Sequence, residues 1–566
     1  MSVLALPWRA GMGALRSRDE QLAAGLVWLL AAALLLFLAW PLSAILVKAL
    51  QARDGSYVGL ANLWELAAEP RMRVAVWNSV YLALMTLGLV LPLALAFAFA
   101  LTRSRIWGKP AFRLAALVPL LAPSLMPAIS LVYLFGNQGL LKSWLGDASI
   151  YGPVGIVLGE IFYTFPHALL ILVTALSVAD ARLYEAAETL GAGKLRRFLT
   201  VTLPNARYGL ISAGLVVFTL VVTDFGVPKV IGGQTNVLAL EAYKQVIGQQ
   251  NFGKGAVVGL LLLLPAVLSV LVERWLARGH GAAMSGRSVA YKPGRNRGRD
   301  ALLWLFCGGM SAFLLALLGV AVAAALMKLW PYNLSLTLDH FDFDQVDGGG
   351  WLAFRNSLKL SGYTALLGTA LVFVCAYLNL KTPAPRLPAA LIRSLALLPM
   401  AVPGLVLGLG YIFCFNNPAN PLHGLYGGMA ILVAATIVHF YTTAHLTLTT
   451  SLRQIDPEIE AVARSLRRPW WRSCLQVTLP ISLPALLDVA RYLFVSSMTT
   501  VSCVIFLYTP DTVLASVAVL NMDDAGDTAA AAAMASLIVA SSLCATLLIN
   551  AAGWLLNRRA QAWRVA

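Results

Sequence analysis

Twelve long apolar runs constrain this sequence more than any other feature. They lie at 22–47, 74–101, 111–135, 151–178, 206–224, 254–275, 301–328, 356–380, 389–415, 425–452, 481–507 and 528–556. A helix needs about 20 apolar residues to cross a bilayer, and each run has about that length or more. The runs are continuously apolar, whereas the strands of a membrane barrel alternate in short segments. We therefore predict an all-α polytopic membrane protein with about twelve transmembrane helices.

The composition excludes several other classes of protein. Of the 566 residues, 59% are hydrophobic and only 12% are charged, which leaves too little polar surface for a soluble enzyme or a disordered chain. The net charge of +16 comes from basic residues in short loops between the runs, so we expect no nucleic-acid partner. The six cysteines form no CxxC pair and the histidines do not cluster, so we predict neither a metal site nor a catalytic site.

Loop charges predict the orientation of the chain. The segments 102–113, 273–300 and 381–393 are basic, as is the C-terminus, whereas 339–347 and 511–527 are acidic. Basic loops stay in the cytoplasm, and these segments alternate along the predicted topology. We therefore expect both termini in the cytoplasm, with tails at 1–21 and 558–566.

Short motifs recur in the same order in the two parts of the sequence, at nearly constant spacing. The pairs are Asn78-Ser79 with Asn356-Ser357, Pro119 and Pro123 with Pro399 and Pro403, and Val201-Thr-Leu-Pro204 with Val477-Thr-Leu-Pro480. Six runs separate the copies, so both copies enter the membrane from the same side. The repeat predicts two parallel six-helix domains, at 22–276 and 301–557, joined by a cytoplasmic linker at 277–300.

A long loop joins the fourth and fifth runs at 180–204, and we name it loop 1. It contains Glu185, Ala186, Ala187, Gly191 and Ala192 and runs on to Leu203-Pro204. Small residues permit a partner to pack closely, and Gly191 permits a sharp turn. We predict two short helices with the turn at Gly191, lying along the cytoplasmic face.

Loop 1 resembles the EAA loop of binding-protein-dependent ABC importer permeases, and the resemblance extends over nearly the whole chain. It implies the type I permease fold, in which each such loop is a coupling helix that fits a cleft on a cytosolic ATPase. The chain has no Gly-x-x-x-x-Gly-Lys-Ser/Thr loop, so we expect the ATPase, which uses ATP and Mg²⁺, to be a separate subunit, present as a homodimer. The resemblance also implies a periplasmic substrate-binding protein, a lipid environment, and no enzymatic activity or bound cofactor in this chain.

The second copy, loop 2 at 456–480, departs from the family pattern. Asp456, Ala463 and the Val-Thr-Leu-Pro ending match loop 1, but Arg467 stands where loop 1 has Gly191. Ala461 stands at the position of Glu185, and Glu460 lies one position earlier. We expect loop 2 to dock a partner as well, through contacts that differ from those of loop 1.

Ionisable residues inside or next to apolar runs are costly in a membrane and are therefore candidates for the substrate path. They are Glu160, Asp224, Lys229, Asp488 and Arg491. Asp488 and Arg491 lie three residues apart and also fit a structural ion pair. Glu160 fits either packing or pore lining. Asp224 fits either an outer gate or a packed structural role, and Lys229 either offers a second charge to a zwitterion or neutralises Asp224.

Two local resemblances indicate which cargo the chain transports. The stretches 224–252 and 507–526 are similar to permeases for 2-aminoethylphosphonate, within the wider group of ferric-iron-type permeases. Phosphonate is our first expectation and ferric iron the alternative within the same class. A twelve-span secondary transporter also predicts parallel halves but does not explain the duplicated loop, and a membrane-embedded enzyme lacks a recognisable site.

Overall fold

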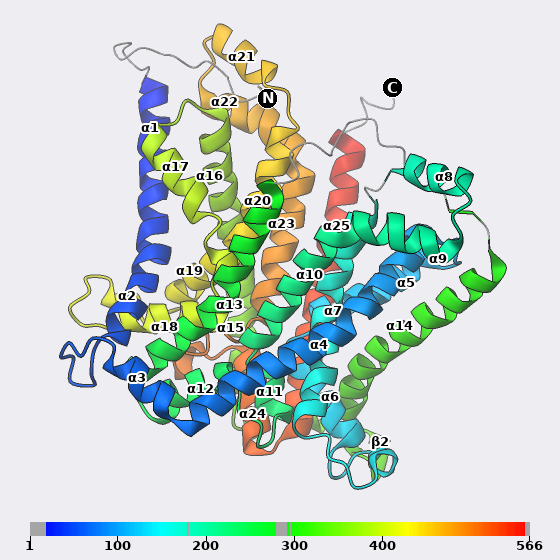
Figure 1. Ribbon diagram of the computed structural model, residues 1–566. Helices are drawn as coiled ribbons and strands as arrows, with labels where there is room; N and C mark the ends of the chain where they lie inside the picture. Colours follow the sequence, from blue (N-terminus) through cyan, green and yellow to red (C-terminus); the bar gives the residue numbers. More distant parts are fainter. Residues whose placement is uncertain (1–17, 178–179, 279–290, 292, 295, 561–566) are drawn as a thin grey trace.

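The computed structural model describes residues 18–560, apart from 178–179, 279–290, 292 and 295. Helices make up most of the described chain, and their long axes run between two ends of the molecule (Figure 1). The predicted tails at 1–21 and 558–566 and the linker at 277–300 lie largely outside the described residues. Within those limits, α13 continues to Arg278 and α14 begins at Arg297, so helix borders both sides of the linker.

The first half contains the helices that follow, in chain order. They are α1 (Arg18–Leu34), α2 (Trp40–Ala49), α3 (Ala61–Ala68), α4 (Pro70–Arg103), α5 (Lys109–Leu117), α6 (Leu125–Phe135), α7 (Pro153–Ser177), α8 (Ala181–Thr189), α9 (Lys194–Arg197), α10 (Leu203–Thr223), α11 (Gly226–Ile231), α12 (Leu238–Tyr243) and α13 (Phe252–Arg278). A π-helical turn at Leu35–Ala39 joins α1 to α2, and another at Phe198–Thr202 joins α9 to α10.

The second half repeats this order and adds a small hairpin. Its elements are α14 (Arg297–Leu326), β1 (Met327–Leu329), β2 (Asn333–Leu336), α15 (Gly350–Tyr363), α16 (Thr369–Lys381), α17 (Arg386–Leu395), α18 (Gly404–Phe415), α19 (Met429–His439), α20 (Tyr441–Arg453), α21 (Glu458–Ser465), α22 (Trp470–Ser473), α23 (Leu479–Thr499), α24 (Ala515–Ala525) and α25 (Thr528–Ala560). The strands β1 and β2 pair antiparallel.

The predicted spans are present, but three of them are bent. In the described residues, nine helical stretches are long and apolar enough to cross a membrane, and three further pairs qualify only as bent units. The predicted runs 111–135 and 389–415 bend by 102° and 115°, because Pro123 and Pro403 lie at the breaks and proline cannot continue a helix. The run 425–452 bends by 57° at Phe440, and the helix of run 481–507 ends at Thr499.

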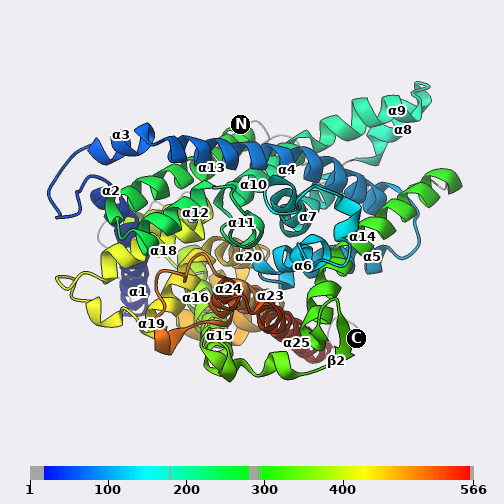
Figure 2. The same ribbon diagram turned by 90° about the horizontal axis from the view of Figure 1, so that it is seen from below.

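The first helix of each half packs against the other half. Helix α1 contacts α16 and α17, whereas α14 contacts α4, α5 and α6 (Figure 2). Buried hydrophobic side chains form one continuous cluster through both halves. The two repeats are therefore exchanged at their edges and share one core, so neither half is closed without the other.

The repeated Asn-Ser motif anchors one helix in each half. The N–H at the first residue of α12 donates to the Ser79 hydroxyl, and that at the first residue of α24 donates to the Ser357 hydroxyl, both at 2.8 Å. The Asn78 side chain donates to the carbonyl of Asn236, and the Asn356 side chain bonds the corresponding segment before α24. Side-chain oxygens that satisfy the free N–H groups at a helix start fix its position. The motif places α12 and α24 at the end of the molecule away from α8 and α21 (Figure 1).

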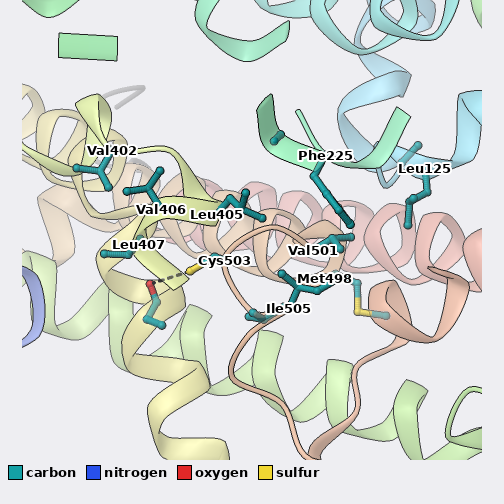
Figure 3. Close-up of a cluster of buried hydrophobic side chains, with 14 of the residues drawn as sticks. Leu125, Phe225, Val402, Leu405, Val406, Leu407, Met498, Val501, Cys503 and Ile505 are labelled. Atoms are coloured by element: carbon teal, nitrogen blue, oxygen red, sulfur yellow. Dashed lines mark hydrogen bonds between the residues drawn. The ribbon is translucent and has the colours of Figure 1, made fainter. Parts of the chain in front are cut away.

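An apolar layer closes the contact between the halves. Phe225 lies just after the end of α10 and points toward Val501 and Met498 (Figure 3). Met498 lies in the last turn of α23, and Val501 follows that helix. The exposed fractions of these three side chains are 1%, 5% and 0%. Leu405 from α18 joins the same layer. The two halves are thus sealed against each other at this level.

Candidate functional site

Loop 1 contains two short helices, α8 and α9, at the same end as the start of α1 and the end of α25 (Figure 1). Asp180 caps α8 by accepting a hydrogen bond from the Arg182 N–H at 3.1 Å. Gly191 ends α8 with φ +72°, and the Ala192 N–H donates to the Ala187 carbonyl at 2.9 Å. This is a Schellman turn, in which a left-handed residue closes the helix. Glu185 and Ala186 are exposed on its outer side.

Loop 2 has the same backbone in spite of its different residues. Arg467 occupies the left-handed position with φ +51°, and the Arg468 N–H donates to the Ala463 carbonyl at 2.9 Å. Asp456 accepts from the Glu458 N–H at 2.9 Å, as Asp180 does in loop 1. Arg467 therefore stands at the structural position of Gly191, as the sequence alignment of the two copies predicts.

The two loops are held to the body of the protein by different chemistry. In the first half, the Arg103 guanidinium lies 4.9 Å from the centre of the Tyr184 ring, and Tyr184 donates to the Thr202 hydroxyl. In the second half, Lys381 forms an ion pair with Glu460 at 3.0 Å, and both side chains are largely buried. Glu460 points inward at the position of Tyr184, so it does not replace the exposed carboxylate of Glu185.

Both loops expose apolar side chains at matching positions. The two members of each pair are separated in the sequence by the same number of residues as Val201 and Val477. The pairs are Leu190 with Leu466, Leu195 with Trp471, and Leu199 with Leu475. Leu190 is 85% exposed and Leu466 is 66% exposed. Apolar groups that cluster on an exposed surface mark an interaction site. The duplicated arrangement presents two related apolar surfaces at one end of the molecule, where docking of a partner stays a prediction.

Glu160 and Asp224 come together at the centre of the first half. Glu160 lies in α7 and is fully buried, and Asp224 directly follows α10. Their carboxyl groups interact with each other, and Asp224 also interacts with the Ser124 hydroxyl. One oxygen of Asp224 accepts from the Val227 N–H at 2.8 Å, which caps the short helix α11.

Lys229 does not pair with Asp224. Its Nζ lies 3.0 Å from a carboxylate oxygen of Asp524 in α24, so the ion pair joins the two halves. Asp523 beside it has its pKa raised to about 6, mainly by burial and then by the neighbouring charge of Asp524. The Lys229 ammonium also faces the Tyr243 ring at 5.9 Å.

A cavity of about 510 Å³ lies next to this ion pair, at the end opposite the two loops. Aromatic rings of both halves line it, including Tyr243 from the first half and Tyr426, Phe506 and Tyr508 from the second. Asn521 adds a polar group. The cavity is large enough for a small organic molecule and lies between the halves.

Asp488 and Arg491 form the predicted ion pair at 3.0 Å, away from the other candidates. Arg491 also donates to the Asn550 side chain of α25 at 2.9 Å. The corresponding link in the first half is a hydrogen bond from Ser212 to Glu273, which joins α10 to α13. Both halves thus link the same pair of neighbouring helices at this level. This favours a structural role for Asp488 and Arg491, which the sequence analysis gave as the alternative to the substrate path.

Sequence reasoning missed the residues that hold the loops, Arg103 and Lys381. Each is the last residue of its helix, and the two have the same spacing in the sequence as Asn78 and Asn356. That spacing is the signal which could have found them. Asp524 was visible only as part of an acidic segment, because its pairing with Lys229 depends on how the halves meet.

The duplicated halves, the two matching loops and the cavity between the halves define a transport permease. Two segments, 88–280 and 368–558, match the family model described as "Binding-protein-dependent transport system inner membrane component". Together they cover more than half of the chain, and the chain belongs to this family. The predicted class of ABC importer permease and the two-repeat all-α fold are thereby confirmed.

Relatives of known name show how broad the family is. The putative ferric transport system permease protein FbpB 1 of Haemophilus influenzae is 26% identical over 84% of this chain and 76% of its own length. The molybdenum transport system permease protein ModB of Mycobacterium bovis is 30% identical over 44% of this chain and 91% of its own length. Among solved structures, a bacterial transporter that imports alginate aligns with 47% of this chain and 97% of its own matched chain, at 16% identity and a TM-score of 0.39.

Proposed function

We propose that this chain is the membrane-spanning subunit of an ATP-driven importer for 2-aminoethylphosphonate or a closely related small phosphonate. It receives cargo from a periplasmic binding protein and releases it into the cytoplasm. Loops 1 and 2 dock on a homodimer of cytosolic ATPase subunits, which bind ATP and Mg²⁺. The chain lies in the bacterial inner membrane with both termini in the cytoplasm, so the cavity beside Lys229 faces the periplasm.

One observation supports the phosphonate cargo above the others. The two stretches that resemble phosphonate permeases, 224–252 and 507–526, are far apart in sequence but meet across the halves. Tyr243 approaches Phe506, which directly precedes the second stretch, with 6.3 Å between ring centroids, and Lys229 pairs with Asp524. The segments that carry the cargo resemblance therefore line the cavity where cargo would enter.

The coupling mechanism follows from how the loops are built. Each loop is a short, hydrogen-bonded unit anchored to the body of its half, by Arg103 in one half and by Lys381 in the other. Closure of the ATPase dimer moves the two loops, and the anchors pass that motion to the halves as rigid bodies. Parting of the halves opens the apolar layer at Phe225 and Val501.

Ferric iron is the second candidate cargo, because the relative FbpB 1 is named as a putative ferric transport system permease protein. The decisive experiment deletes the gene for this chain and measures uptake of radioactive 2-aminoethylphosphonate and of radioactive ferric citrate. We expect loss of phosphonate uptake and of growth on the phosphonate as sole phosphorus source, with iron uptake unchanged. Loss of iron uptake alone would assign the chain to the ferric group instead.

A further inference from the structure

Glu160 is a buried acid for which the fold supplies no counter-charge. Its side chain is 0% exposed, and neither carboxylate oxygen receives a hydrogen bond from a donor in the described part of the chain. None of the ion pairs found among the described residues includes Glu160 or Asp224. Lys229, the basic residue nearest to Asp224 in sequence, is engaged by Asp524.

Two adjacent carboxyl groups cannot both be ionised in such a place. Like charges disfavour each other's ionised form, and burial disfavours it further. Even a single carboxylate is costly at membrane depth. The pair therefore holds a proton when empty, or a cation that enters from elsewhere, so that at most one negative charge remains.

The pair lies where a passing molecule would meet it. Tyr163, one turn beyond Glu160 on α7, lies within electrostatic range of both carboxyl groups and of Tyr492 of α23, which belongs to the second half. Phe225, next to Asp224, closes the apolar layer between the halves. The acidic pair thus borders the surface along which the two halves separate.

The second half has no such pair. When the copies are aligned on Val201 and Val477, Thr436 stands at the position of Glu160 and Thr500 at that of Asp224. Thr436 donates to its own helix at the Leu432 carbonyl. The acidic pair is therefore specific to the first half, and the path between the halves is asymmetric in charge at this level.

We propose that Glu160 and Asp224 form a binding site for a primary ammonium group, which is the amino end of the cargo if the proposed function holds. An ammonium has three N–H donors, and the two carboxylates and the Ser124 hydroxyl offer three acceptors. Cargo that reaches this site replaces the proton that the two carboxyl groups share when empty, and the released proton passes to water.

The first experiment measures binding without any transport. Full-length chain in lipid nanodiscs is heated with ethylammonium chloride or with sodium chloride at equal concentration. We expect ethylammonium, and not sodium, to raise the melting temperature by about 2 °C or more. Glu160→Gln and Asp224→Asn should lose this rise, whereas Glu241→Gln should keep it. Glu241 is a matched control, because it is also buried but accepts hydrogen bonds from Asn236 and Gln245.

The melting temperature without ligand separates binding from a structural role. Because neither oxygen of Glu160 has a hydrogen-bond donor in the described part of the chain, Glu160→Gln should be as stable as the wild type or more so. A lower melting temperature would mean that Glu160 is a structural residue and would overturn the site. So would an equal response to sodium, or no response of the wild type to ethylammonium.

The second experiment measures uptake in vesicles that contain the ATPase and the binding protein. Wild-type vesicles that import no 2-aminoethylphosphonate refute the proposed function, and the ethylammonium result still stands by itself. If wild-type vesicles import it, Glu160→Gln and Asp224→Asn should import about tenfold less, since a charge-assisted hydrogen bond contributes about 1.5–3 kcal/mol. Uptake equal to the wild type in both variants would refute the ammonium site alone.

Discussion

Loop 1 and loop 2 close their first helix with the same hydrogen bonds, yet one has Gly191 and the other Arg467 in the left-handed position. Their anchors differ more. A cation over a neutral ring holds loop 1, and a buried ion pair holds loop 2. Trp470 adds a second anchor to loop 2 by donating to the Asp19 carbonyl at the start of α1. After duplication, the backbone of the loop has been kept while the residues that hold it have diverged.

The largest expected effect comes from breaking the anchor of loop 2. Lys381→Met leaves Glu460 buried without its partner, which should destabilise the second half by about 3–5 kcal/mol. Thermal unfolding of the purified chain measures this. Lys381→Met combined with Glu460→Gln removes both charges and should recover most of the loss. A double variant as unstable as the single one would show that the ion pair is not the anchor.

The same change in the first half sharpens the comparison. Arg103→Met leaves no orphaned charge, because its partners are the rings of Tyr184 and Tyr291 and the Leu176 carbonyl. We expect a smaller loss of about 1–3 kcal/mol. If Arg103→Met proved as harmful as Lys381→Met, the distinction between the two anchors would be lost.

The second prediction exchanges the residues at the left-handed position. Gly191 has open space where a side chain would start, so Gly191→Arg meets no clash and should cost about 1 kcal/mol of backbone strain. The variant should fold and insert, but ATP hydrolysis stimulated by the binding protein should be lost, because a charged chain projects from the docking surface. Arg467→Gly should be stabilised by a similar amount and keep its activity. Normal transport by Gly191→Arg would remove Gly191 from the docking surface.

The sequence predicted the repeat, the number of spans and the shape of loop 1, because each rests on local patterns. Apolar length defines a span, and the spacing of small residues around Gly191 defines the turn. The offset between copies also placed Arg467 at the correct backbone position. The docking role of these residues stays a prediction.

The sequence could not predict which charges meet. Lys229 lies five residues from Asp224 but pairs with Asp524 across the halves, and Glu160 of α7 meets Asp224 although loop 1 and α10 separate them in the chain. Both contacts depend on how helices pack after the chain breaks at Pro123 and at Phe225. Short breaks inside apolar runs carry no hydropathy signal, so the bends themselves were also missed.

A third prediction tests what the two halves share. Ser79→Ala and Ser357→Ala each remove the acceptor for the first N–H of α12 or α24, and each should cost about 1 kcal/mol. Because the two hydrogen bonds are equal in length, the two losses should agree within experimental error. A large difference between them would mean that the halves have diverged at this anchor too.

The smallest expected effect concerns a feature that only the second half has. Burial and Asp524 raise the pKa of Asp523 from 3.8 to about 6, so the folded protein holds this proton more tightly than the unfolded chain. Stability should therefore fall as the pH rises from about 4 to about 6, and change little from this group above that window. Asp523→Asn should remove this slope and unfold at a slightly higher temperature than the wild type at pH 7.5. Melting temperatures measured every half unit of pH provide the test, with Asp527→Asn as the control. The prediction fails if the melting temperatures of the wild type and of Asp523→Asn change in parallel between pH 4 and pH 6. That result would show that Asp523 ionises without penalty beside Lys229.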